Sequence, residues 1–181
     1  GKNFLDLIVD QVRYARRHYG ARLPLVFMDS FRTTEDTLSH LAGHPDLAVD
    51  GLPLDFLQNA EPKILADDLS PVSWPADPTL EWCPPGHGDL FSTIWESGLL
   101  DALEAQGFKY LFISNSDNLG ARPSRTLAQH FENTGAPFMI EVAKRTPADR
   151  KGGHIVRDKV TGRLMLREMS QVHPDDKDDA Q

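Results

Sequence analysis

The chain has 181 residues, of which 40% are apolar and 25% are charged, and its formal net charge is -8. The acidic balance argues against broad nucleic-acid binding, which needs clustered Lys and Arg, and no apolar run approaches the roughly 20 residues that span a membrane. The single cysteine, Cys83, excludes a disulfide framework within the chain, so we expect a cytoplasmic globular protein.

The first part of the chain predicts helices that alternate with short buried strands. Apolar residues recur at helical spacing over residues 3–19. The run LPLVFM at 23–28 has no polar alternation, which is typical of a strand buried on both faces. Thr33 opens a T-x-x-D signal for a helix over about 34–42, and LPLDFLQ at 52–58 predicts a second strand.

The middle of the chain begins with a Pro-rich segment, residues 61–85, which predicts a long functional or mobile loop. Helical patterning returns over 90–107 and is interrupted by a glycine. KYLFIS at 109–114 and PFMIEV at 137–142 predict two further buried strands, with a helix between them that opens at Pro123.

The pattern changes near the end of the chain. Two alternating segments around the turn KVTG, after Lys151, predict a β-hairpin. The tail, residues 171–181, is polar and acidic and is expected to fray, so residues 1–170 are expected to form one partial domain. Strands that alternate with helices predict an α/β fold with a mostly parallel sheet flanked by helices. Ligands of such sheets bind beyond the carboxyl ends of the strands.

The strongest chemical signal is PPGHGD, residues 84–89. Its two glycines permit positive φ angles and close approach of a ligand, and His87 can donate to an anion. A helix is predicted directly afterwards, so Gly86 and its neighbours can present N–H groups to a phosphate or a uracil carbonyl. The alternative is a tight turn capped by Asp89, with no ligand.

A second polar block, SNSDNLGA at 114–121, follows the predicted strand over 109–114. Asn115 and Asp117 are two residues apart, so on an extended chain they point the same way. The Asp117 carboxylate can bind magnesium, a hard cation that prefers oxygen and often bridges to phosphates. Asn115 can donate to and accept from sugar hydroxyls. The alternative is an Asx-turn that ends a strand.

Two weaker signals follow other predicted strands. Gln58 ends one of them, and its amide complements the imide edge of uracil. Glu141 ends another and can accept hydrogen bonds from sugar hydroxyls, while Gly153 allows a sugar ring to lie against the backbone. The alternative in each case is a solvated side chain or a basic surface loop. Two histidines, His40 and His44, flank the end of a predicted helix and are expected at the surface.

These blocks resemble the eukaryotic-type UDP-glucose pyrophosphorylases, in the same order and with compatible gaps. The resemblance covers about residues 2–172 and is carried by PLVFMDSFRTTEDT (24–37), FLQN (56–59), WCPPGHGDLF (82–91), YLFISNSDNLGA (110–121) and EVAKRTPADRKGGH (141–154). It implies a Rossmann-like nucleotidyltransferase domain that makes UDP-glucose and pyrophosphate from UTP and glucose 1-phosphate, with magnesium as the cofactor.

The resemblance also implies roles for single residues. The candidate catalytic residues are His87, on the sugar-phosphate side, and Asp117, which matches the aspartate tied to magnesium. Nucleotide contacts are expected from Met28, Gln58, Gly86 and Asp117. Sugar contacts are expected from His87, Asn115, Glu141 and Gly153.

The chain departs from the family pattern at several points. Asp29 stands where the family usually has Asn, Cys83 replaces an aromatic residue, and His154 replaces a Thr. The family's Gly-rich phosphate loop and two of its lysines match no segment here, so the chain is expected to be an internal part of a longer enzyme and nearly inactive by itself. Alternatives are a related UDP-sugar or UDP-N-acetylhexosamine pyrophosphorylase and a non-catalytic UDP-sugar-binding paralogue. The sequence leaves the oligomeric state open.

Overall fold

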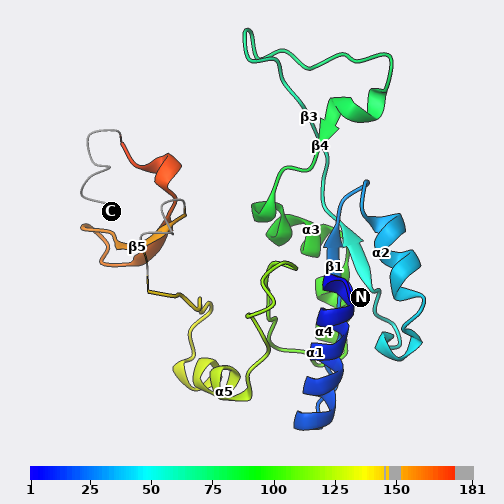
Figure 1. Cartoon of the computed structure of the whole chain (residues 1–181). Coiled ribbons are helices and arrows are strands. Elements are labelled where there is room, and N and C mark those ends of the chain that lie inside the picture. The colour runs from blue at the N-terminus through cyan, green and yellow to red at the C-terminus, as the bar shows by residue number, and fades with distance from the viewer. Residues whose placement is uncertain (145, 147–151, 174–181) are drawn as a thin grey trace. The chain divides into compact units, whose positions relative to one another are not determined.

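The structure is a computed structural model that describes residues 1–144, 146 and 152–173 (Figure 1). The chain divides into two compact units, Gly1–Asn133 and Thr134–Gln181. The helices are α1 (Phe4–Tyr19), α2 (Thr34–Leu41), α3 (Leu90–Glu96), α4 (Leu99–Ala105) and α5 (Arg125–Thr134). The 3-10 turns are η1 (Pro45–Leu47), η2 (Pro78–Glu81), η3 (His87–Asp89) and η4 (Met169–Gln171). The strands are β1 (Phe27–Asp29), β2 (Asp55–Leu57), β3 (Glu61–Pro62), β4 (Trp82–Cys83), β5 (His154–Arg157) and β6 (Leu164–Arg167).

The centre of the first unit is a parallel strand pair with helices on both faces (Figure 1). On one face, Phe27 of β1 packs against an apolar cluster from α1, α2 and η1 that consists of Val9, Leu41 and Leu47. On the other face, Met28 packs against a cluster of Phe56, Leu99 and Leu103, from β2 and α4. Successive strand residues point to opposite faces, so the continuous apolar run is used on both sides. For this pair the predicted α/β arrangement is confirmed.

The opening helix shows why the local sequence folds as predicted. Asn3 accepts a hydrogen bond from the Asp6 N–H, and Asp6 accepts one from the Asn3 N–H, which forms a capping box at the start of α1. The helix ends at Gly20, which has a left-handed φ of 59°. None of the helices in the described ranges has the length and apolar character needed to cross a membrane.

Two of the predicted strands are wrong in this structure. Residues 109–114 and 137–142 have no strand partner in the described part of the chain, and Phe112 and Val142 are 52% and 61% exposed. A strand needs a hydrogen-bonded neighbour as well as an apolar sequence, and β1 and β2 pair only with each other. The predicted mostly parallel sheet is therefore confirmed only in part, by the parallel pair of β1 and β2. The described residues form one parallel pair and two antiparallel pairs, β3–β4 and β5–β6.

The second unit confirms the predicted hairpin. β5 and β6 pair antiparallel, with His154 opposite Arg167. The turn between them is held by the Asp158 carboxylate, which accepts hydrogen bonds from the backbone N–H and the hydroxyl of Thr161. Most of the predicted acidic tail, from residue 174 onward, lies outside the described residues.

Asp29 ends β1 and is buried, and its carboxylate ties that strand to α2. Its Oδ1 atom accepts hydrogen bonds from the hydroxyls of Thr33 (2.8 Å) and Thr37 (3.0 Å). Its Oδ2 atom is buried and has no hydrogen-bond partner among the described residues. Thr33 precedes the helix as predicted, but its hydroxyl donates to Asp29 instead of accepting from a helix N–H. The contact between β1 and α2 at Asp29 therefore depends on the hydroxyls of Thr33 and Thr37.

The Thr37→Val variant should lower the free energy of unfolding by about 1–3 kcal/mol, because a buried carboxylate loses one of its two donors while the side-chain volume stays the same. Thr126→Val, at an exposed position of α5, is the matched control and should change that free energy by less than about 0.5 kcal/mol. Urea denaturation measures both values. Equal effects in the two variants would show that the Thr37–Asp29 contact is not stabilising.

Candidate functional site

The PPGHGD block forms a turn whose backbone favours glycine at Gly86. Gly86 has a φ of 110° and precedes η3, in which the Asp89 N–H donates to the Gly86 carbonyl at 3.1 Å. A Cβ at Gly86 would meet no atom within 4 Å, so the preference for glycine comes from the backbone conformation and not from lack of space. Gly88 is equally open but has no positive φ. His87, between the two glycines, is exposed.

Asp89 holds this turn against the segment that follows β2. Its Oδ2 atom accepts hydrogen bonds from the Asn59 backbone N–H (2.7 Å) and the Thr93 hydroxyl (2.8 Å). Its Oδ1 atom accepts from the Asn59 side-chain amide (2.9 Å) and the Ser92 hydroxyl (3.0 Å). These hydrogen bonds, the one from the Asn59 side chain first among them, lower the pKa of Asp89 to about 2. The turn is therefore fixed directly beside Gln58.

The Asp89–Asn59 contact was missed by the sequence analysis. The sequence predicts Asp89 only as the cap of a turn without a ligand, and it predicts no role for Asn59. The sequence does contain a local signal for the hydrogen bonds of Asp89 with Ser92 and Thr93. Asp89 precedes these residues by three and four positions at the start of a predicted helix. Nothing in the sequence pairs Asp89 with Asn59, which is 30 positions earlier.

Four of the predicted residues lie around the carboxyl ends of β1 and β2, namely Met28, Gln58, Gly86 and His87. The Met28 side chain packs into the apolar core, as expected for its strand. The backbone N–H of Gln58 donates to the Asp29 carbonyl at 2.8 Å, which continues the parallel register by one residue. Gly86 and His87 are held at the carboxyl ends of β1 and β2 by the Asp89–Asn59 contact. This edge is where ligands of α/β sheets bind.

Asn115 and Asp117 lie in the same unit but in a separate turn. The Asn115 carbonyl accepts a hydrogen bond from the Asn118 N–H at 3.1 Å. The turn is anchored to α1, because the Gln11 side-chain amide donates to the Leu119 carbonyl at 3.0 Å. Both predicted site side chains are exposed. Within residues 1–133, no hydrogen bond joins this turn to the PPGHGD turn, so a direct link between the two is not observed.

Glu141 and Gly153 belong to the second unit. Glu141 is exposed and ends the segment that was predicted as a strand. A Cβ at Gly153 would lie 2.7 Å from Leu166 Cδ1 and 3.1 Å from the Glu168 Oε1 atom, so glycine is favoured there by packing within the hairpin. Most of the basic block between them, residues 145 and 147–151, lies outside the described residues. The sugar-binding roles of these two residues stay predictions.

The low pKa of Asp89 gives a pH-dependent contribution to stability. Its folded pKa of about 2 lies below the ordinary value of 3.8, so this contribution is complete above about pH 4 and is lost as the pH falls through about 2. In Asp89→Asn, the difference in the free energy of unfolding from the wild type should therefore be largest near neutral pH and should shrink between about pH 4 and pH 2.

Urea midpoints near pH 7, pH 4 and pH 2.5 measure this difference. Asp67→Asn, an exposed aspartate of the long loop, is the matched control and should follow the wild type at every pH. A difference that stays constant down to the lowest pH would mean that the four donors do not act through the Asp89 charge.

The parallel pair covered on both faces places the chain among the α/β proteins, whose ligands bind at the carboxyl edge of the sheet. Comparison with known proteins specifies the family. The whole chain, residues 1–181, matches the family described as UTP--glucose-1-phosphate uridylyltransferase. The chain belongs to this family.

Individual relatives agree with this assignment. The chain is 41% identical over 174 residues to the UTP--glucose-1-phosphate uridylyltransferase of Saccharomyces cerevisiae, covering 95% of this chain and 34% of the relative. It is 39% identical over 175 residues to the probable enzyme of Schizosaccharomyces pombe, covering 96% and 34%. The chain therefore spans about a third of the length of these curated relatives.

Solved structures give the same result for the fold. The UDP-glucose phosphorylase structure from Trypanosoma brucei matches with a TM-score of 0.88 and 38% identity, covering 100% of this chain and 40% of that one. A mutant of UDP-glucose pyrophosphorylase from Leishmania major, solved in complex with UDP-glucose, matches with a TM-score of 0.84 and 38% identity, covering 99% and 40%. The backbone path of the chain is thus that of this family.

Proposed function

We propose that the protein transfers a uridylyl group from UTP to glucose 1-phosphate, which gives UDP-glucose and pyrophosphate. The family match over the whole chain supports this reaction. The observation that carries the proposal is the hydrogen-bonded link from Asp89 to Asn59. It fixes the Gly86 turn beside Gln58, and these are the two segments to which uridine contacts are assigned.

The uridine end of the substrate is recognised at the carboxyl edge of β1 and β2. The Gln58 side-chain amide has one acceptor and two donors, which complement the imide edge of uracil. The Gly86 N–H donates to the nucleotide, and its open surroundings leave room for a ring to approach the backbone. Met28 contributes a contact from β1 while its side chain remains in the core.

The phosphates and the sugar are oriented by the exposed polar residues. His87 donates to the sugar phosphate, while Asn115 and Glu141 orient the sugar hydroxyls and Gly153 lies against the sugar. An oxygen of the sugar phosphate attacks the α-phosphorus of UTP, and the bond to pyrophosphate breaks. This chemistry requires positioning and charge neutralisation, with no covalent protein nucleophile.

Magnesium fits the donor chemistry of Asp117. The side chain offers exposed carboxylate oxygens, and Mg²⁺ is commonly bound by one or two carboxylates together with waters and substrate phosphates. When bound, the ion would neutralise negative charge on the phosphates. We also propose that residues 1–170 are part of the catalytic domain, that the protein works in the cytoplasm on small molecules, and that nucleic acid and membranes are not its partners.

The test uses the product of the longest open reading frame that contains these 181 residues. We call this product the parent protein. Pyrophosphate release is measured with UTP and one of three acceptors, namely glucose, galactose or N-acetylglucosamine 1-phosphate. The proposal expects the highest kcat/KM with glucose 1-phosphate and loss of turnover when divalent ions are chelated.

Each alternative gives a different result in the same assay. A preference for another sugar 1-phosphate would reassign the substrate within the family. Tight UDP-glucose binding by the parent protein, without pyrophosphate release from any of the three acceptors, would replace the enzyme with a non-catalytic binding protein.

A further inference from the structure

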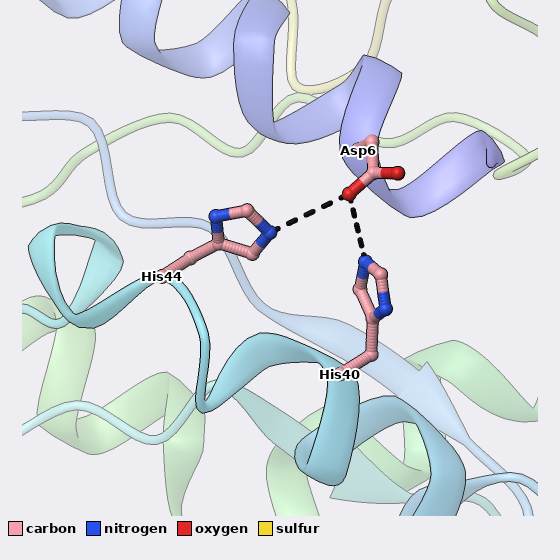
Figure 2. Close-up of side chains that lie close together, drawn as sticks. All are labelled: Asp6, His40 and His44. Carbon is pink, nitrogen blue, oxygen red and sulfur yellow. Dashed lines mark hydrogen bonds and ion pairs between the residues drawn. The ribbon is translucent and has the colours of Figure 1, made fainter. Parts of the chain in front are cut away.

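Three side chains of the first unit converge between α1 and the end of α2, and none of them is a residue assigned to uridylyl transfer. Figure 2 shows Asp6 of α1 pointing toward His40 of α2 and His44, which precedes η1. The Asp6 Oδ1 atom lies 2.9 Å from His40 Nε2 and 3.5 Å from His44 Nε2. One ligand atom from each residue lies within 4.8 Å of the other two. The two histidines were expected at the surface, but their side chains are only 31% and 21% exposed.

These distances suit a shared metal ion. Zn–N bonds and Zn–O bonds of about 2.0–2.2 Å, in tetrahedral geometry, place neighbouring ligand atoms about 3.3 Å apart. The distances of 2.9 Å and 3.5 Å in the structure lie on either side of that value. Two imidazole nitrogens and one carboxylate oxygen are also the ligand types that zinc accepts, and three protein ligands leave a fourth position for water. We propose that Asp6, His40 and His44 form a Zn²⁺ site.

The scaffold around the cluster is rigid without the ion. Asp6 uses its Oδ2 atom to accept a hydrogen bond from the Asn3 N–H, which leaves Oδ1 directed at the histidines. The apolar cluster of Val9, Leu41 and Leu47 holds α1 against α2 and η1, and each of these residues is at most 1% exposed. Binding therefore requires little ordering of the backbone, which favours affinity.

Arg13 makes a contact that the metal must change. Its Nη2 atom lies 3.2 Å from His44 Nδ1, and arginine can only donate, so Nδ1 accepts and the ring proton is on Nε2. Ligation through Nε2 moves that proton to Nδ1, and the Arg13 N–H then has to turn away. Arg13 keeps its Nε hydrogen bond to the Asp46 carboxylate at 2.7 Å, so its charge stays paired.

Zinc binding is tested on the 181-residue protein near neutral pH by titration with ZnCl₂ in competition with a chromophoric chelator. The expected result is one zinc per chain, with affinity at least about tenfold weaker in His40→Gln and in His44→Gln. His18→Gln, which replaces an exposed histidine of α1 outside the cluster, is the matched control and should bind like the wild type. Asp6 also caps α1, so the two histidine variants carry the test without loss of the helix cap.

A second readout separates this site from other zinc ligands and from misfolding. Zinc should raise the thermal midpoint of the wild type and of His18→Gln but not that of the two cluster variants, whose far-UV circular dichroism should match the wild type. Zinc binding that survives in a His40→Gln/His44→Gln double variant but disappears in Cys83→Ser would overturn the proposal. So would a wild-type protein that binds no zinc, since the three side chains would then form only hydrogen bonds.

Discussion

Replacing Gly86 with alanine should weaken uridine-nucleotide binding by the parent protein at least about tenfold. The φ of 110° at Gly86, with ψ near 180°, is in a region that residues with a Cβ rarely adopt, and forcing one there costs about 1–3 kcal/mol. The turn avoids that strain by rotating the peptide, which redirects the N–H assigned to the nucleotide. A binding titration with UTP should show a Kd at least about tenfold higher, because a loss of about 1.4 kcal/mol corresponds to a factor of ten.

Gly88→Ala is the matched control for this experiment. It lies two residues away in the same turn, has no positive φ, and a Cβ there would meet no atom within 4 Å. Its UTP affinity should stay within a few-fold of the wild type. If both variants lose binding equally while remaining folded, the requirement for glycine comes from close approach of the ligand and not from the backbone conformation. If neither loses binding, the turn does not contact the nucleotide.

The secondary structure was predictable where it depends on neighbouring residues, and less so where it depends on a distant partner. The helix predicted over 3–19 is α1, because its amphipathic spacing and its caps are local. The strand predicted over 23–28 contains two of the three residues of β1, and the strand predicted over 52–58 contains all of β2, but the paired residues are only three in each. An apolar run predicts which residues become buried. A strand also requires a hydrogen-bonded neighbouring strand, which the run does not specify. The segment at 109–114 shows the same limit, because it is strongly apolar and has no partner among the described residues.

In the candidate site, too, local features were predictable from the sequence and contacts between distant residues were not. The positive φ angle of Gly86 was predictable, because it depends on the local G-x-G sequence after two prolines, in which glycine readily adopts this conformation. The contact that positions Gly86 was not, because Asp89 and Asn59 are 30 residues apart and no local pattern pairs them. The cluster of Asp6, His40 and His44 was equally hidden, since 34 residues separate its first two members. In both cases the pairing depends on how α1, α2 and the ends of β1 and β2 pack.

Replacing Asp117 with asparagine should lower kcat of the parent protein about 10²–10³-fold, the range found when a group that stabilises transition-state charge is removed. Asparagine has nearly the same size but lacks the negative charge that a magnesium ion bridging to phosphate requires. The stability of the protein should not change, because the Asp117 side chain is exposed and its turn is held by backbone contacts and by Gln11. Steady-state pyrophosphate release with varied magnesium concentration measures the effect.

The dependence on magnesium distinguishes metal binding from a general effect of charge. If Asp117 binds the ion, the asparagine variant needs a higher magnesium concentration for half-maximal rate, and Asp101→Asn, an exposed aspartate of α4, behaves like the wild type. An equal loss of kcat in both variants would reflect the overall charge of the domain. An unchanged magnesium requirement in Asp117→Asn, together with a raised KM for UTP, would make Asp117 a nucleotide-positioning residue, because binding of the substrate would then be weakened without any change at the metal.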